Sequence, residues 1–196
     1  MRYVLSDLDG VLVDSGAEVE RIWREWAAEH GIDPDEVARA SHGVPAAGVL
    51  AIVAPHLNSP DEIDRIERAH AATGGQALPG AAELLALDHV GVVTSCSPEL
   101  AAARLRAAGL PTPEILITSD LTSRGKPHPD PYLAGAAALG ADPAECLVIE
   151  DAPAGVQAAR AAGMTVWAVT TTHSAAELTG ADEVLSGLDE VLSRRR

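Results

Sequence analysis

Two aspartates stand two residues apart after the first apolar segment of the chain. Asp7 and Asp9 follow residues 3–6, and Gly10 then permits a sharp turn. Two carboxylates placed this closely repel each other unless a cation lies between them, and Mg²⁺ prefers carboxylate oxygen as a ligand. Paired acids after a strand are also common as surface or capping residues. This motif alone therefore suggests a metal site without deciding it.

Two further polar motifs follow apolar runs. Thr94 and Ser95 come after residues 90–93 and precede a helix, where hydroxyls and backbone amides suit an anion, although a capping residue is the simpler interpretation. Glu150 and Asp151 end the apolar run that begins at position 146. A buried run that delivers two acids is more typical of a metal site than of a helix cap.

Lys126 is the only lysine in the chain. The 14 basic residues other than histidine are this lysine and arginines, and Lys126 lies in a proline-rich loop, 124–132. A chain that uses arginine everywhere else indicates that a compact ammonium group is needed at this position. A single surface lysine without a function is also possible, so Lys126 supports a functional site only together with the other motifs.

The four motifs need elements that bring them together. Short apolar runs alternating with Ala-rich helices predict parallel strands. These strands are expected at 3–6, 90–94, 114–118, 146–150, 165–170 and 183–185, with helices ending at Gly109, Gly140 and Gly163. Because the C-terminal ends of parallel strands share one sheet edge, the four motifs should meet there. The predicted fold is α/β, a Rossmann-like parallel sheet with helices on both faces.

A helical segment interrupts this pattern after the first strand. Its helices are predicted at 18–30, 34–40, 46–56 and 61–73. A connection of this length is too long for a simple crossover. We expect a small inserted α-helical cap domain over 15–78, on a core domain formed by 1–14 and 79–196. Trp23 and Trp26, three residues apart on the first helix, predict a packing face.

Composition narrows the classes of partner. The chain has 196 residues, of which 47% are hydrophobic, so it is not a disordered chain. Its formal net charge of −15 repels nucleic acid and anionic membranes, and no apolar run approaches the roughly 20 residues that span a bilayer. Its first residues do not resemble a secretory signal, and Cys96 and Cys146 predict no disulfide framework. We expect a cytoplasmic monomer that binds neither nucleic acid nor membrane.

The four motifs, at 7–15, 93–98, 124–132 and 147–155, together resemble those of the haloacid dehalogenase (HAD) superfamily, in order and over essentially the whole chain. The insertion is similar to the helical cap of the subgroup that includes β-phosphoglucomutase. Within that subgroup, several segments resemble glycerol-phosphate and 2-deoxyglucose-6-phosphate phosphatases, namely 125–133, 150–155 and 170–172. The resemblance implies a Mg²⁺-dependent phosphatase that acts on a small phosphorylated metabolite, a sugar or polyol phosphate.

The resemblance implies roles for the acids. Asp7 would be the nucleophile that forms an aspartyl-phosphate, and Asp9 the general acid and base. Dehalogenases of the superfamily lack an acid at the position of Asp9, so its presence favours phosphoryl transfer. The Asp7 side chain, the Asp9 backbone carbonyl and Asp151 would hold Mg²⁺, with Glu150 supporting the metal site.

The resemblance also implies binding roles. Lys126 and Ser95, or Thr94 in place of Ser95, would bind the phosphate oxygens. His42 and Gly43 of the inserted segment would contact the substrate. Phosphatases of this kind usually carry an arginine shortly after such a His-Gly pair, and this chain has Pro45 there, which puts one substrate contact in doubt.

Three alternatives follow from the same resemblance. β-Phosphoglucomutases carry a cap histidine ten residues after the second aspartate, where this chain has Val19, so a mutase is disfavoured. Phosphonatases need a cap lysine, and residues 15–78 contain none. A non-catalytic binding module that has kept the fold would be signalled by the loss of a motif acid, and all of them are present.

Overall fold

Six strands form one parallel sheet in the computed structural model, which describes residues 2–41 and 44–195. The strands are β1 (Tyr3–Ser6), β4 (Val90–Val93), β5 (Ile115–Ile117), β6 (Cys146–Glu150), β7 (Thr165–Val169) and β8 (Glu183–Leu185). Their order across the sheet is β5, β4, β1, β6, β7, β8. Each lies inside a predicted strand segment, so the α/β prediction is confirmed.

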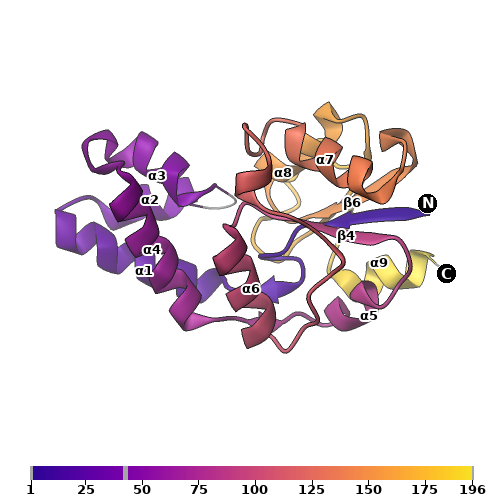
Figure 1. Cartoon of the computed structure of the whole chain (residues 1–196), viewed down its shortest axis with the longest axis horizontal. Coiled ribbons are helices and arrows are strands. Elements are labelled where there is room, and N and C mark those ends of the chain that lie inside the picture. The colour runs from indigo at the N-terminus through magenta and orange to yellow at the C-terminus, as the bar shows by residue number, and fades with distance from the viewer. Residues whose placement is uncertain (1, 42–43, 196) are drawn as a thin grey trace.

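Helices cover both faces of this sheet (Figure 1). One face carries α5 (Ala81–Leu85), α6 (Pro98–Ala107) and α9 (Leu188–Arg195), and the other carries α7 (Asp130–Leu139) and α8 (Pro153–Ala161). Short 3₁₀ turns, η2 (Ser119–Leu121) and η3 (Pro143–Glu145), precede α7 and β6. Successive residues of a strand point to opposite faces, so Val4 of β1 joins one apolar cluster and Leu5 the other.

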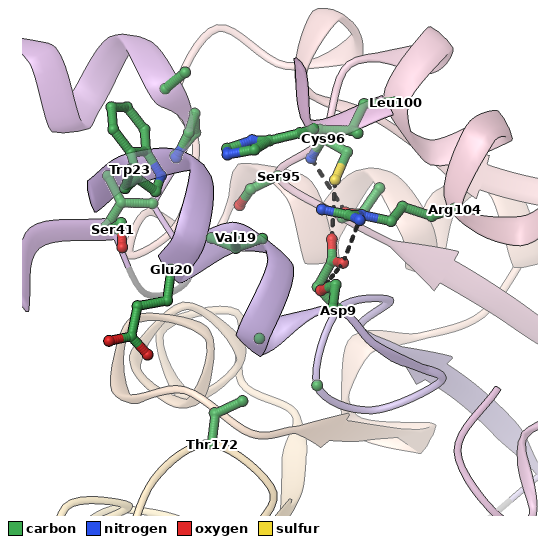
Figure 2. A pocket seen from close by; sticks show the side chains of 18 of the residues that line it. Asp9, Val19, Glu20, Trp23, Ser41, Ser95, Cys96, Leu100, Arg104 and Thr172 are labelled. Atoms are coloured by element: carbon green, nitrogen blue, oxygen red, sulfur yellow. Dashed lines mark hydrogen bonds and ion pairs between the residues drawn. The ribbon is translucent and has the colours of Figure 1, made fainter. Parts of the chain in front are cut away.

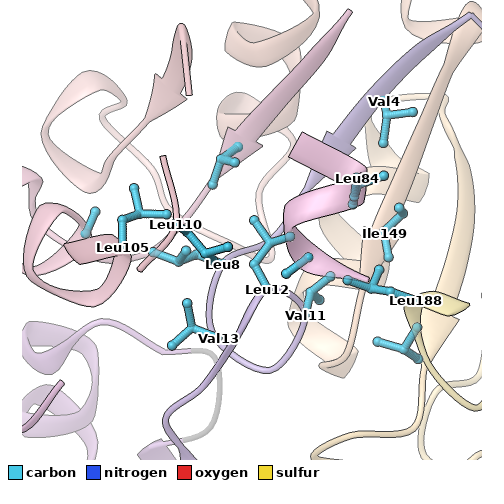
Figure 3. Close-up of a cluster of buried hydrophobic side chains, with 14 of the residues drawn as sticks. Val4, Leu8, Val11, Leu12, Val13, Leu84, Leu105, Leu110, Ile149 and Leu188 are labelled. Carbon is cyan, nitrogen blue, oxygen red and sulfur yellow. The ribbon is translucent and has the colours of Figure 1, made fainter. Parts of the chain in front are cut away.

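The loop after β1 is anchored in the first of these clusters. Leu8, Val11 and Leu12 are at most 1% exposed and pack there with side chains from β4 and the surrounding helices (Figure 3). Because these apolar side chains are buried, their packing fixes the conformation of the loop. Asp7 and Asp9, which flank Leu8, are therefore held at the C-terminal end of β1.

Helices between the first and second sheet strands form a bundle beside the sheet (Figure 1). They are α1 (Gly16–His30), α2 (Pro34–Ser41), α3 (Ala46–Val53), the 3₁₀ turn η1 (Pro55–Leu57) and α4 (Pro60–Thr73). This helical unit, residues 16–73, has its own apolar cluster. Trp23 and Trp26 lie in it, each 2% exposed and meeting edge to face with ring centroids 5.6 Å apart. The predicted packing face is confirmed.

Two details of the helical unit differ from the prediction. Its chain enters and leaves through a two-stranded antiparallel pair, β2 (Val13–Asp14) and β3 (Gln76–Ala77), where no strand was predicted. Strands of two residues carry no periodic pattern, so only the pairing reveals them. The helix predicted at 46–56 ends instead at Val53, because Pro55 has no amide hydrogen and disfavours helical backbone at the residue before it.

The predicted helix ends are confirmed. Gly109, Gly140 and Gly163 follow α6, α7 and α8 with φ angles of 67°, 63° and 78°, values that glycine adopts easily. Among the helices that the structure describes, none has both the length and the apolar character needed to cross a membrane.

Candidate active site

Groups at the ends of three strands meet around Lys126. Its Nζ lies 2.9 Å from Oδ1 of Asp7 after β1 and 2.7 Å from Oε1 of Glu150 at the end of β6. It also donates to the backbone carbonyl of Val93 in β4, at 3.1 Å. The single lysine of the chain is thus buried and contacts groups at three adjacent strands. The expected meeting of these motifs at one sheet edge is observed.

Both oxygens of Glu150 are already occupied by donors. Oε1 accepts from Lys126 and from the Tyr132 hydroxyl at 2.6 Å, and Oε2 accepts from the backbone amides of Asp151 at 3.0 Å and Ala152 at 3.2 Å. Burial and the Glu150 charge raise the pKa of Tyr132 well above its usual value, so this hydroxyl remains a donor. The fully buried Glu150 side chain therefore orients Lys126 and the loop after β6.

Two glycines allow the acids to lie where they do. Gly10 has a φ of 79°, and a Cβ there would overlap the Asp151 carboxylate. A Cβ at Gly155, in the first turn of α8, would overlap the Glu150 carboxylate. A side chain at either position would displace an acid of the site.

Three buried acids form a cluster whose donor set suits a divalent cation. Among the described residues, Asp7, Glu150 and Asp151 offer carboxylate oxygens that lie within 4.8 Å of one another. Oδ2 of Asp151 accepts from the Thr172 hydroxyl, whereas Oδ1 is buried and has no hydrogen-bond partner in the part of the chain that the structure describes. Carboxylate oxygens are the ligands that Mg²⁺ prefers, so these residues fit that ion.

Burial acts on the charges of this cluster. It raises the pKa of Asp7 to about 7, where the Lys126 charge opposes and the Glu150 charge assists the rise. Burial, with the charges of Glu150 and Asp7, raises the pKa of Asp151 well above its usual value. Burial disfavours the Lys126 ammonium, but the two neighbouring carboxylates outweigh it and raise the pKa of Lys126. The cluster thus contains three acidic side chains and one ammonium group, so its acids are not fully neutralised by the protein.

Asp9 points to a different set of partners (Figure 2). Its carboxylate accepts from the Ser15 hydroxyl and, at 3.0 Å, from the Cys96 thiol, and Nε of Arg104 lies 3.2 Å from its Oδ1. Burial and the Asp9 charge raise the pKa of Cys96 well above its usual value, so the thiol stays a donor. The Asp9 carboxylate is thus held by these partners and is not one of the grouped acids Asp7, Glu150 and Asp151.

A pocket lies between the sheet edge and the helical unit. It encloses about 130 Å³, room for a small molecule, and both Thr94 and Ser95 line it, as do Asp7, Asp9 and Asp151. From the helical unit it is lined by, among others, Val19, Trp23, Ser41, Pro45 and His70. The predicted substrate residues His42 and Gly43 lie outside the described residues.

The chain matches the haloacid dehalogenase-like hydrolase family over residues 1–163. It belongs to this family. It is 45% identical to hexitol phosphatase A from Escherichia coli (strain K12) over 191 residues, 92% of this chain and 88% of that protein. It is 30% identical to glycerol-1-phosphate phosphohydrolase 2 from Saccharomyces cerevisiae, covering 86% and 74% of the two chains. A HAD family hydrolase from Deinococcus radiodurans R1, crystallised with phosphate and sodium, superposes with a TM-score of 0.75 at 34% identity, over 100% of this chain and 95% of that one.

These comparisons confirm the resemblance that the motifs indicate. This HAD hydrolase is a phosphoric monoester hydrolase, as its relatives are. Its six-stranded parallel sheet with helices on both faces is the Rossmann-like fold of that family.

Sequence reasoning missed two residues of the pocket. His70 belongs to none of the sequence motifs, yet it is 6% exposed and lines the pocket. Arg104 is 1% exposed and faces Asp9. Arg104 lies between Ala103 and Leu105, which are buried, but Arg106 of the same helix is exposed, so the local sequence does not mark Arg104 as buried. No local signal marks His70 either.

Proposed function

We propose that this HAD hydrolase is a Mg²⁺-dependent phosphatase that removes the phosphoryl group from a small sugar or polyol phosphate through an aspartyl-phosphate on Asp7. One observation carries the proposal: the buried ammonium of Lys126 contacts Asp7 beside Asp151, whose Oδ1 has no partner among the described residues. A nucleophile, a phosphate-binding cation and a metal ligand thus share one sheet edge. Relatives named as a hexitol phosphatase and a glycerol-1-phosphate phosphohydrolase support the substrate class.

Mg²⁺ would be held by the side chains of Asp7 and Asp151 and by the backbone carbonyl of Asp9. When bound, it neutralises negative charge on the transferring phosphoryl group. Burial raises the pKa of Asp7 to about 7, and a bound cation would favour its ionised, nucleophilic form. Glu150 would support the site through Lys126, because its oxygens already accept from four donors.

The reaction would proceed in two displacements. A carboxylate oxygen of Asp7 bonds to phosphorus while the bond from phosphorus to the ester oxygen breaks, and Asp9 donates its proton to the leaving alkoxide. Water then bonds to phosphorus while Asp9 takes its proton, and the bond from phosphorus to Asp7 breaks to release phosphate. Lys126 and either Ser95 or Thr94 would bind the phosphate oxygens throughout, and the pocket location of both hydroxyls supports either choice.

The helical unit would act as the cap. We propose that residues 15–78 form a cap domain on a core of 1–14 and 79–196, connected through the β2 and β3 pair. Roles for His42 and Gly43 in substrate contact stay predictions, as do the monomeric state and the cytoplasmic location. Pro45 lines the pocket, so the segment after these two residues borders the substrate space without a cationic side chain at that position.

Measured phosphate release tests the function directly. Hexitol phosphates, glycerol phosphate and p-nitrophenyl phosphate are supplied with and without Mg²⁺ to wild type, Asp7→Asn and the control Asp14→Asn, an exposed aspartate of β2. We expect Mg²⁺-dependent release that falls at least about 1000-fold in Asp7→Asn and persists in Asp14→Asn.

Two outcomes would overturn this proposal. Retention of full activity by Asp7→Asn would remove the aspartyl-phosphate route. Isomerised sugar phosphate without net release would move the assignment to a mutase, which the apolar side chain of Val19 in the pocket lining does not favour.

A further inference from the structure

Three buried polar side-chain atoms have no hydrogen-bond partner in the described chain, and all three belong to residues that line the pocket. One is Oδ1 of Asp151, which the metal would occupy. The other two are Nε2 of His70 and Nε of Arg104, of which the latter lies 3.2 Å from Oδ1 of Asp9 in an ion pair. Buried polar atoms without partners are costly, so they indicate a ligand that supplies the missing hydrogen bond. The proposed metal accounts for Asp151 but not for His70.

The His70 side chain is held firmly at the pocket wall. It lies in the last turn of α4, is 6% exposed, and meets the Trp23 ring at 69° with centroids 5.8 Å apart. The Thr73 hydroxyl donates to the backbone carbonyl of His70 at 2.9 Å and therefore does not bond the ring. Packing therefore orients the imidazole, and Nε2 has no hydrogen-bond partner among the described residues.

The charge state of His70 suits a neutral ligand group. Burial and the positive charge of Arg104 lower its pKa to about 4, with the Asp9 charge opposing them, so the ring is uncharged at neutral pH. An uncharged imidazole nitrogen either donates or accepts one hydrogen bond, and a hydroxyl can do the complementary part in both tautomers. A second phosphate or a carboxylate on the substrate would instead call for a cation.

The neighbours of His70 indicate which hydroxyl it reaches. The charges of Arg104 and Asp9 both act on His70, and Nε of Arg104 lies 3.2 Å from Oδ1 of Asp9. Asp9 is the proposed proton donor to the leaving oxygen, and because His70 lines the same pocket, we place its ring beside the carbon chain that follows that oxygen. The pocket wall there also includes Val19 and Leu100, which can pack against carbon.

We propose that Nε2 of His70 binds the hydroxyl on the carbon adjacent to the phosphorylated one, which makes His70 a specificity-determining residue for monophosphates of vicinal diols. This inference rests on the proposed phosphatase function. It narrows the substrate class to polyol and open-chain sugar phosphates with a hydroxyl at that position.

Three substrates that differ only in hydroxyls provide the test: propane-1,2-diol 1-phosphate, propane-1,3-diol 1-phosphate and n-propyl phosphate. With Mg²⁺, wild type should prefer the 1,2-diol phosphate by about 10-fold to 100-fold in kcat/KM over the other two. His70→Phe keeps a ring without the hydrogen bond and should bring this preference close to one. His70→Gln, which can still hydrogen-bond, should retain part of it. His56→Phe, an exposed histidine of η1, should keep the wild-type preference.

The outcomes separate this inference from the function on which it rests. If wild type hydrolyses n-propyl phosphate as well as the 1,2-diol phosphate, the His70 assignment is refuted while the phosphatase stands. An equal loss on all three substrates in His70→Phe shows a purely structural role and refutes it too. If wild type turns over none of the three nor p-nitrophenyl phosphate, the proposed function fails, and the inference fails with it.

Discussion

Replacing Lys126 by methionine measures how strongly the acids of the site depend on one ammonium group. Methionine keeps most of the length and the apolar stem of the side chain and removes the ammonium group with its charge and hydrogen bonds. In the native protein Nζ lies 2.9 Å from Asp7 and 2.7 Å from Glu150, and the lysine side chain is 3% exposed. The variant leaves two buried carboxylates facing each other without their shared cation.

The free energy of unfolding should fall by about 3–5 kcal/mol, the cost of removing one partner from a buried ion pair. The sign agrees with the raised pKa of Lys126, because its carboxylate neighbours stabilise the ammonium by more than burial disfavours it. Such a loss is a large share of the roughly 5–15 kcal/mol that stabilises a typical domain. Adding Glu150→Gln to Lys126→Met removes one of the unpaired charges and should recover part of the loss.

Urea unfolding in the presence of EDTA, followed by tryptophan fluorescence, measures these differences. Arg124→Met is the matched control, since it removes an exposed cation of the same loop whose partner is Asp130 at 2.8 Å. Exposed pairs contribute little, so this control should unfold near the wild-type urea concentration. The reasoning is refuted if Lys126→Met unfolds with the control, or if the double variant is no more stable than Lys126→Met alone.

Two further predictions concern stability. Gly155→Ala should lower the free energy of unfolding by about 1–3 kcal/mol despite its helical position, because the new Cβ overlaps the Glu150 carboxylate, whereas Gly187→Ala meets nothing within 4 Å and should change little in the same urea assay. His70 has a pKa of about 4 when folded against 6.5 when unfolded, so the unfolded chain binds more protons between these values. Stability should therefore fall by up to about 3 kcal/mol as the pH drops from 6.5 towards 4. In His70→Gln that part of the pH dependence should be absent, and an unchanged pH profile would contradict the assignment.

The sequence by itself determined the sheet and the edge at which its motifs meet. The strands are short, mainly apolar runs of the kind that parallel sheets bury. Glycines end the helices between them because glycine adopts a positive φ easily. These are local properties, so they can be recognised without knowing what lies nearby. The placement of Asp7 and Asp151 at one edge then follows from parallel topology, because each directly follows a strand, whereas Lys126 reaches that edge from the loop before α7.

Tertiary structure decided what those motifs contact. Glu150 and Asp151 are adjacent in the chain, yet one accepts from four donors while the other keeps a buried oxygen without a partner among the described residues. His70 and Arg104 come from different helices, and their nearness to Asp9 depends on how α4 packs against α6. Hydrogen-bond saturation, burial and charge proximity arise between positions far apart in the chain, so no local pattern contains them.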